Sequence, residues 1–108
     1  MLRSLLLAAL VPLAAWALWA NADDAATPLD ERQARLFGEI CATCHVQPGT
    51  GAPIAGQPDD WAEARARGLE QMLARTVNGY LGMPPLGTCG SCSEDDFRGL
   101  IRFMSGTP

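Results

Sequence analysis

The chain has 108 residues, enough for one small domain, and its 12 acidic residues outnumber its 8 basic ones, for a formal net charge of −4. This acidic balance argues against nucleic-acid binding, which needs a basic surface. A domain of this length buries only a modest apolar core, so it usually needs a metal, disulfide bonds or a large cofactor to be stable.

The first 22 residues are typical of a secretory signal peptide. A basic start with Arg3 precedes an uncharged apolar run from Leu5 to Trp19, and Ala20-Asn21-Ala22 fits the small-residue pattern of a cleavage site. We expect cleavage after Ala22, which leaves residues 23–108 as the exported domain. An uncut N-terminal membrane anchor is the alternative, but the run is shorter than the ~20 apolar residues that span a bilayer and it contains Pro12.

A first helix is predicted to begin at Thr27 and to run into a cysteine motif. Thr27 is a suitable N-cap, and Pro28 is tolerated in the first turn of a helix. Apolar residues then recur at intervals of three and four, which marks one helical face. Those after Leu29 are Leu36, Phe37, Ile40, Cys41 and Cys44.

The segment Cys41-Ala42-Thr43-Cys44-His45 has the Cys-x-x-Cys-His spacing of a covalent haem attachment site. Two thiols three positions apart on a helical turn can each bond one vinyl group on the same edge of a porphyrin. The histidine that follows then lies under the iron and can bind it. The alternatives are a redox Cys-x-x-Cys pair and a zinc site that uses all four cysteines of the chain, although the gap from Cys44 to Cys89 is much wider than a zinc-ribbon spacing.

The middle of the chain is predicted to hold a loop and two helices. Residues 46–58 are dense in Gly and Pro and show no helical or strand period. Asp59 is expected to cap a short helix over residues 60–67, which Gly68 ends, and Gly79 is the expected C-cap of the next helix. The apolar face of that second helix consists of Leu69, Met72, Leu73 and Val77.

A methionine is expected as the second axial ligand of the iron. His45 is the only histidine, so two histidines of one chain cannot both bind the metal. Met72 and Met104 lie on predicted apolar helix faces, where methionine usually fills gaps in a core. Met83 instead lies in a loop, where two following prolines stiffen the backbone and Gly82 allows close approach. We therefore predict Met83 as the ligand.

A second Cys-x-x-Cys pair, Cys89 and Cys92, precedes the last predicted helix. Ser93 replaces the histidine that a second haem site would need, so we expect a disulfide in an oxidising compartment, with a catalytic dithiol as the alternative. Ser93-Glu94-Asp95-Asp96 resembles a helix capping box. The apolar face that follows consists of Phe97, Leu100, Ile101 and Met104. No strand-like alternation stands out, so the predicted fold class is all-α.

The motifs also occur in a characteristic order. They are Phe37, Cys41-Ala42-Thr43-Cys44-His45, Gly51-Ala52-Pro53, Trp61, Gly82-Met83-Pro84-Pro85 and Cys89-Gly90-Ser91-Cys92. This order resembles cytochrome c5, a group of class I bacterial c-type cytochromes, and the resemblance covers about Leu29 to Met104. The Met-Pro-Pro sequence followed by a Cys-x-x-Cys pair is its most specific part.

The resemblance implies a small class I cytochrome c fold, with about four short helices around one covalently bound haem c. It implies that the thioethers of Cys41 and Cys44 hold this haem and that His45 and Met83 are the axial ligands of its iron. It also implies that the backbone carbonyl of Pro53 accepts a hydrogen bond from the axial imidazole, which would fix the ring's orientation.

The resemblance further implies a Cys89–Cys92 disulfide and a crossing of the first and last helices near Phe37 and Phe97. Many class I cytochromes carry a small glycine two turns before the first haem cysteine, and this chain has Gln33 there. We therefore expect Ala34 or Gly38 to allow the helices to cross.

The implied function is one-electron transfer in the periplasm. A monomeric carrier with both axial positions filled by protein has no site for a substrate, so we expect redox partner proteins, no catalytic residues and no enzymatic activity. Contact with a membrane is expected only through those partners or an uncleaved N-terminus. The alternatives are the haem-bearing subunit of a periplasmic dehydrogenase complex and a haem sensor or gas binder in which Met83 is displaced.

Overall fold

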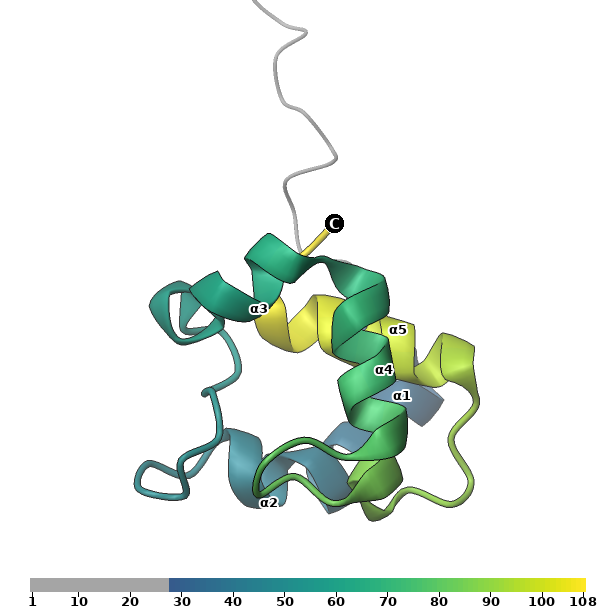
Figure 1. Cartoon of the computed structure of the whole chain (residues 1–108). Coiled ribbons are helices and arrows are strands. Elements are labelled where there is room, and N and C mark those ends of the chain that lie inside the picture. Colours follow the sequence, from purple (N-terminus) through teal and green to yellow (C-terminus); the bar gives the residue numbers. More distant parts are fainter. Residues whose placement is uncertain (1–27) are drawn as a thin grey trace, which may run out of the picture.

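The computed structural model describes residues 28–108, which form helices, turns and loops (Figure 1). In this part of the chain the only strand-like pairing is one isolated β-bridge between Tyr80 and Met83. The all-α prediction is therefore confirmed. No helix among residues 28–108 is long and apolar enough to cross a membrane. The predicted signal peptide, its cleavage site at Ala22 and the predicted cap Thr27 lie outside the described residues.

The first helix is continuous from Glu31 to His45 and has three parts. They are α1 (Glu31–Leu36), the π-helical turn η1 (Phe37–Cys41) and α2 (Ala42–His45). In the π-helical turn the backbone N–H of Ala42 donates to the carbonyl of Phe37, five residues back. This wider turn changes which side the following residues face, so it determines how the cysteine motif is presented.

The predicted start of this helix at Thr27 is wrong, because Asp30 is the N-cap. The Asp30 carboxylate accepts a hydrogen bond from the backbone N–H of Gln33 at 2.7 Å. The side-chain oxygen of Gln33 in turn accepts from the N–H of Asp30 at 3.2 Å. These reciprocal bonds form a capping box, and they favour a start at Glu31 over one beside Pro28.

Two further helices follow the loop that leaves His45. A 3-10 turn, η2 (Pro58–Trp61), leads directly into α3 (Ala62–Arg67), and α4 (Leu69–Asn78) comes next. Gly68 and Gly79 end α3 and α4 as predicted, with φ of 93° and 84°. The predicted cap Asp59 is wrong, because the chain enters α3 through the 3-10 turn without a side-chain cap.

The last segments are the short turn η3 (Pro85–Thr88) and α5 (Glu94–Ser105). The predicted capping box at Ser93 is confirmed. The hydroxyl of Ser93 accepts from the N–H of Asp96 at 3.1 Å, and the Asp96 carboxylate accepts from the N–H of Ser93 at 2.9 Å.

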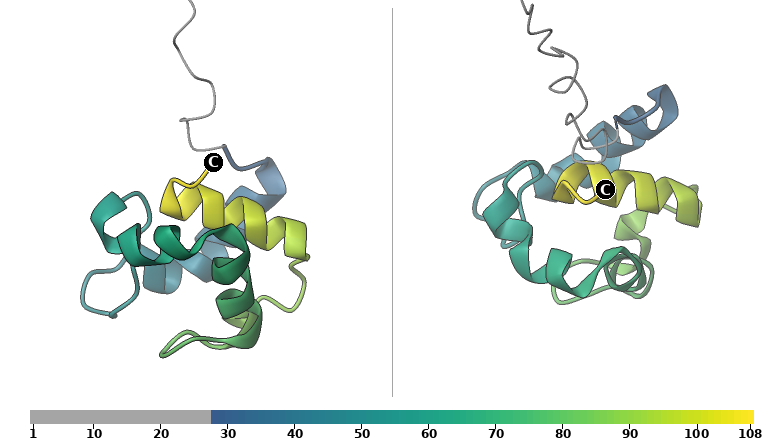
Figure 2. Two further views of the ribbon diagram at one scale, coloured as in Figure 1. Left: turned by 45° about the horizontal axis from the view of Figure 1, so that its top comes forward. Right: turned by 90° about the horizontal axis from the view of Figure 1, so that it is seen from above.

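The core lies where α5 packs against both α1 and α4, an arrangement seen in Figures 1 and 2. The predicted apolar faces of α4 and α5 provide most of it. The buried apolar residues are Leu36, Trp61, Met72, Leu73, Cys89, Phe97, Leu100, Ile101 and Met104. With α1 to α2 counted as one helix and η2 with α3 as another, the fold has the four short helices that were expected.

The first and last helices approach each other at Gln33 and Gly99. A Cβ at position 99 would lie 2.5 Å from the amide nitrogen of the Gln33 side chain, so this side chain would have to move to admit one. The expectation that Gly38 allows the crossing is wrong, because a Cβ there would meet nothing within 4 Å. The ring of Phe37 packs edge-on against Phe103 of the last helix, with 5.1 Å between the ring centroids.

An ion pair reinforces this helix contact. The guanidinium of Arg32 lies 2.5 Å from the carboxylate of Asp96 and also donates to the carbonyl of Ser91 at 3.0 Å. The hydrogen bond from Arg32, followed by that from the Ser93 backbone, holds the pKa of Asp96 below its usual range. Arg32 therefore joins the first helix to the start of α5 and to the loop before it.

We predict that Asp96→Asn lowers the free energy of unfolding at pH 7 by roughly 1–3 kcal/mol, the usual cost of losing hydrogen bonds to a charged group. The folded-state pKa lies below the unfolded-state value of about 3.9, so the stabilisation is fully present above about pH 5. It is lost as the pH falls through the lowered folded-state pKa. Urea unfolding at pH 7 and at about pH 2 measures the difference.

The control is Asp59→Asn, which changes an exposed carboxylate without an ion pair among the described residues. It should leave the unfolding free energy nearly unchanged at both pH values. A loss for Asp96→Asn that is the same at both pH values would contradict the electrostatic explanation.

Candidate functional site

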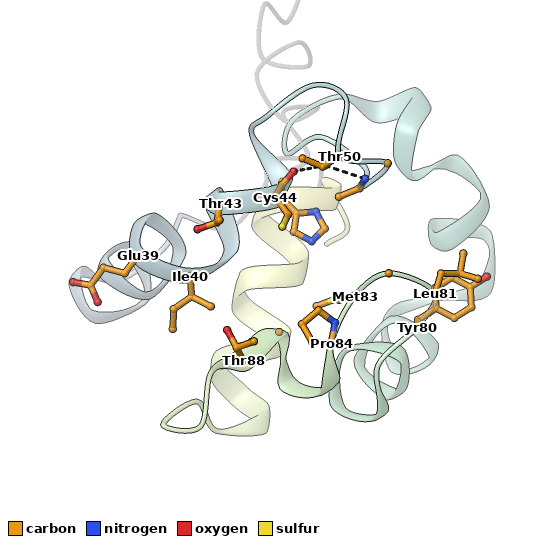
Figure 3. Close-up of a pocket in the computed structure, with 15 residues that line it drawn as sticks. Glu39, Ile40, Thr43, Cys44, Thr50, Tyr80, Leu81, Met83, Pro84 and Thr88 are labelled. Carbon is orange, nitrogen blue, oxygen red and sulfur yellow. Dashed lines mark hydrogen bonds between the residues drawn. The ribbon is translucent and has the colours of Figure 1, made fainter.

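A cavity of about 600 Å³ lies among the described residues. Its walls are residues 39–40 and 43–45 at the end of the first helix, residues 50–52 of the loop that follows, and residues 80–84 with 87–88 before α5, so Cys44 lines it and Cys41 does not. Figure 3 shows Thr43 and Cys44 on one side of it and Met83 and Pro84 on the opposite side. Glu39 is the only carboxylate in its lining, and no Lys or Arg is part of it. A cavity of this size fits a large, mainly apolar organic group.

His45 lies at the end of α2, where the residue is only 8% exposed and borders the cavity. The Nδ1 atom is 2.8 Å from the carbonyl oxygen of Pro53, which can only accept a hydrogen bond. The proton therefore belongs on Nδ1, and Nε2 keeps the lone pair that a metal ion needs. The structure thus places Pro53 beside His45 as the resemblance implies.

Trp61 supports the His45 ring from the other side. The two rings stack with centroids 5.6 Å apart and an interplanar angle of 23°. The indole N–H of Trp61 donates to the carbonyl of Ile54 at 2.8 Å, and the N–H of Ala55 donates to the carbonyl of His45 at 2.7 Å. The sequence pattern included Trp61 but gave no role for it, because its stacking on His45 depends on how the loop between the two residues folds.

Thr50 shapes the loop beside the cysteine motif. Its hydroxyl donates to the carbonyl of Cys44 at 3.0 Å, and the N–H of Ala52 donates to that hydroxyl at 3.2 Å (Figure 3). These bonds close the loop over the end of α2. Nothing in the sequence pattern singled out Thr50.

Cys41 and Cys44 carry free thiols. Cys41 is half-buried and Cys44 is exposed at the cavity. Burial raises the pKa of the Cys41 thiol. A reactive cysteine needs a lowered pKa, so this environment does not favour the redox alternative for the pair.

Met83 is the only methionine in the lining of the large cavity. Its position is fixed by two backbone hydrogen bonds with Tyr80, one in each direction, at 2.9 and 3.0 Å. Met72 and Met104 are buried in the core and border a smaller cavity of about 90 Å³, which His45 and Met83 also line. The structure therefore brings Met83 and His45 to the same cavity.

Arg75 is the only cation in the lining of either cavity, and it borders the smaller one. Its guanidinium stacks on the ring of Tyr80, with Cζ 3.9 Å from the ring centroid, and pairs with Glu63 at 3.1 Å. The hydrogen bond from Arg75, ahead of that from Arg67, lowers the pKa of Glu63. The guanidinium has five donors, so this pairing leaves others free for a ligand.

Cys89 and Cys92 are joined by a disulfide, with their Cα atoms 5.5 Å apart. The zinc alternative needs thiolates from all four cysteines, and this bond uses two of them. Among the described residues no three His, Cys, Asp or Glu side chains form a metal-binding cluster. The disulfide follows directly after the turn η3, which borders the cavity at Gly87 and Thr88.

Comparison with known protein families gives one matching family model. The model described as "Cytochrome C oxidase, cbb3-type, subunit III" matches residues 28–104.

Two curated relatives are similar over most of the folded part. Cytochrome c5 of Ectopseudomonas mendocina is 38% identical over 73 residues, which cover 66% of this chain and 84% of that protein. Cytochrome c5 of Azotobacter vinelandii is 42% identical over 74 residues, which cover 66% of this chain and 88% of that protein.

Two solved structures have a similar fold. One is a chain in the crystal structure of an electron transfer complex of nitrite reductase with cytochrome c. It has a TM-score of 0.63 and 29% identity, and the match covers 72% of this chain and 95% of that one. The other is a mono-haem ferrocytochrome c from Shewanella putrefaciens, with a TM-score of 0.63 and 28% identity over 76% of this chain and all of that one.

We predict that thiol labelling of the haem-loaded protein without reductant finds neither Cys89 nor Cys92. The reason is that both sulfur atoms are used in the disulfide. After reduction, labelling should reach two thiols per chain, as counted by mass spectrometry. Full labelling of both residues before reduction would contradict the prediction, and the double variant Cys89→Ser with Cys92→Ser is the control for background labelling.

Proposed function

This chain belongs to the cytochrome c5 group of the class I c-type cytochromes, and from that membership we propose the roles of its site residues. A single covalently bound haem c and one-electron transfer come with the group. We propose that Cys41 and Cys44 form the thioether bonds to the haem and that His45 and Met83 are the axial ligands of its iron. No catalytic residue is assigned.

One observation supports this assignment most directly. His45 and Met83, from segments far apart in the sequence, border the same cavity, and Cys44 lies beside them. The imidazole Nδ1 is already bonded to Pro53, so only Nε2 remains for a metal. The donor set of one imidazole and one thioether suits haem iron.

The remaining lining residues fit the haem group as well. The large cavity is bordered almost entirely by uncharged side chains, which suit the porphyrin ring. Arg75 borders the smaller cavity and has guanidinium donors to offer to a haem carboxylate. When bound, the haem supplies an iron atom that gains and loses one electron.

The protein's own residues determine how that chemistry is used. With His45 and Met83 both bound to the iron, neither a substrate nor oxygen would have a coordination site, and we propose that the chain is not itself an enzyme. The thioether of Met83 favours ferrous iron and raises the potential relative to a second imidazole.

Redox proteins are the partners of such a carrier, and we propose that the chain meets them as a monomer in the periplasm after cleavage at Ala22. The relative in complex with nitrite reductase illustrates a partner of this type. The relatives named as cytochrome c5 favour a carrier over the subunit of a dehydrogenase complex.

We predict that the haem is covalently attached. Haem should stay with the polypeptide during acidic acetone extraction, because two thioether bonds hold it. Cys41→Ser or Cys44→Ser should leave little or no stable holoprotein after periplasmic expression. Haem that extracts freely from the unmodified chain would contradict the covalent assignment.

We predict that Met83→Ala abolishes the weak far-red sulfur-to-iron absorption band of the ferric protein. The reduction potential should fall by on the order of 0.1 V, a modest part of the ~0.8 V over which axial ligands adjust haem potentials. Visible spectra and potentiometric titration measure the two effects.

Met72→Ala is the matched control, because Met72 is buried on α4 and borders only the smaller cavity. Its loss should reduce stability by roughly 2–5 kcal/mol, as for other large-to-small changes in a core, and leave the band in place. If Met72→Ala removes the band and Met83→Ala does not, the ligand assignment is wrong.

A further inference from the structure

The turn before the disulfide contains three consecutive residues with left-handed backbone. Leu86, Gly87 and Thr88 have φ of 60°, 54° and 68°. Two of the three carry side chains, and threonine is β-branched, which makes this conformation especially unfavourable. The left-handed backbone alone therefore does not explain why residue 87 is a glycine.

Gly87 differs from Leu86 and Thr88 because the Met83 side chain lies where a Cβ of residue 87 would point. A Cβ at this position would be 3.3 Å from the terminal methyl carbon, Cε, of Met83, which is tighter than an ordinary van der Waals contact. Apart from the neighbouring residues in the chain, no other atom lies within 4 Å of that place. The missing side chain of Gly87 thus leaves room for one group, the thioether methyl of Met83.

The backbone on the Gly87 side is held in place. The N–H of Gly87 donates to the carbonyl of Pro84 at 3.0 Å, and the N–H of Cys89 donates to the carbonyl of Leu86 at 2.9 Å. The Cys89–Cys92 disulfide begins directly after this turn.

The backbone on the Met83 side is held as well. Two hydrogen bonds join Met83 to Tyr80, and a Cβ on Gly79 would lie 3.1 Å from the Met83 carbonyl oxygen. The group that can yield to a new methyl at residue 87 is therefore the Met83 side chain itself.

We propose that Gly87 is a positioning residue that selects the side-chain conformation of Met83 and thereby the direction of its sulfur lone pairs. A thioether sulfur has two carbon substituents, so the place of its methyl decides where the lone pairs point. When the Met83 methyl lies against Gly87, the Met83 side chain favours one conformation, in which a sulfur lone pair is directed for binding a metal. This inference rests on the proposed ligation by Met83.

The test compares Gly87→Ala with Gly106→Ala in the haem-loaded protein. Gly106 also has a left-handed backbone, with φ of 70°, but a Cβ there would meet nothing within 4 Å, so the pair separates backbone strain from the methyl contact. The readouts are the far-red band of the ferric form, the NMR shift of the Met83 methyl in the ferrous form, and the imidazole concentration that displaces the methionine.

Gly87→Ala is expected to weaken or shift the far-red band, to move the methyl resonance, and to lower the displacing imidazole concentration by roughly tenfold, the usual upper cost of an off-rotamer side chain. Gly106→Ala is expected to match the unmodified protein in all three. Identical results for the two variants would overturn the inference.

A variant that does not accumulate is also informative. Gly87→Asn carries the same Cβ, and asparagine tolerates left-handed backbone, so it replaces Gly87→Ala if that variant is not recovered. It is expected to give the same three changes. If neither is recovered while Gly106→Ala is, Gly87 serves the fold and the positioning proposal is overturned.

Failure of the ligand assignment gives a different result. In that case the far-red band is missing from the unmodified protein or survives Met83→Ala. A band that depends on Met83 but is unchanged in Gly87→Ala contradicts only the positioning inference.

Discussion

The hydrogen bond between the imidazole of His45 and the carbonyl of Pro53 is the contact on which the rest of the site depends. It fixes the ring, and it fixes a loop that has no regular structure of its own. The same loop is held by the carbonyl of His45 through Ala55 and, one residue later, by the carbonyl of Met104 in α5 through the N–H of Gly56. The orientation of the His45 ring and the path of the loop that follows it are therefore fixed together, by the same set of hydrogen bonds.

The two sides of the cavity are built by different physical means. On the histidine side, a helix end, a buried ring and the stacked indole of Trp61 provide rigid, apolar support. On the methionine side, short turns, backbone hydrogen bonds and a disulfide fix the chain, and residues 80–88 contain no fully buried side chain. Regions with few buried contacts open locally at lower cost. The histidine side is thus the more stable of the two.

Sequence reasoning succeeded where a short-range rule decides the outcome. The spacing of the cysteine motif, the apolar periods of α4 and α5, and the capping box at Ser93 all depend on residues within one or two turns. The start of the first helix was harder to predict, because Thr27 and Asp30 are both residue types that cap helices well. Only the reciprocal hydrogen bonds between Asp30 and Gln33 favour Asp30.

Contacts between distant segments were not predictable in the same way. The small residue at the helix crossing is Gly99 of the last helix, whereas the prediction considered only residues of the first helix. No local pattern in the sequence indicates that Gly99 contacts Gln33. The ion pair of Arg32 with Asp96 and the stacking of Trp61 on His45 likewise depend on how the chain returns to itself. For the candidate site, the sequence identified the residues, and the tertiary fold determines which side of each one faces the cavity.

The contact between the first and last helices has a consequence for the order of folding. Gln33 meets Gly99 and Arg32 meets Asp96, so the two ends of the domain hold each other. Long-range contacts of this kind form late, because the whole intervening chain must be brought together first. The core is incomplete until α5 packs against α1 and α4. The segment with Cys41 and Cys44 is therefore expected to stay accessible until the last helix docks.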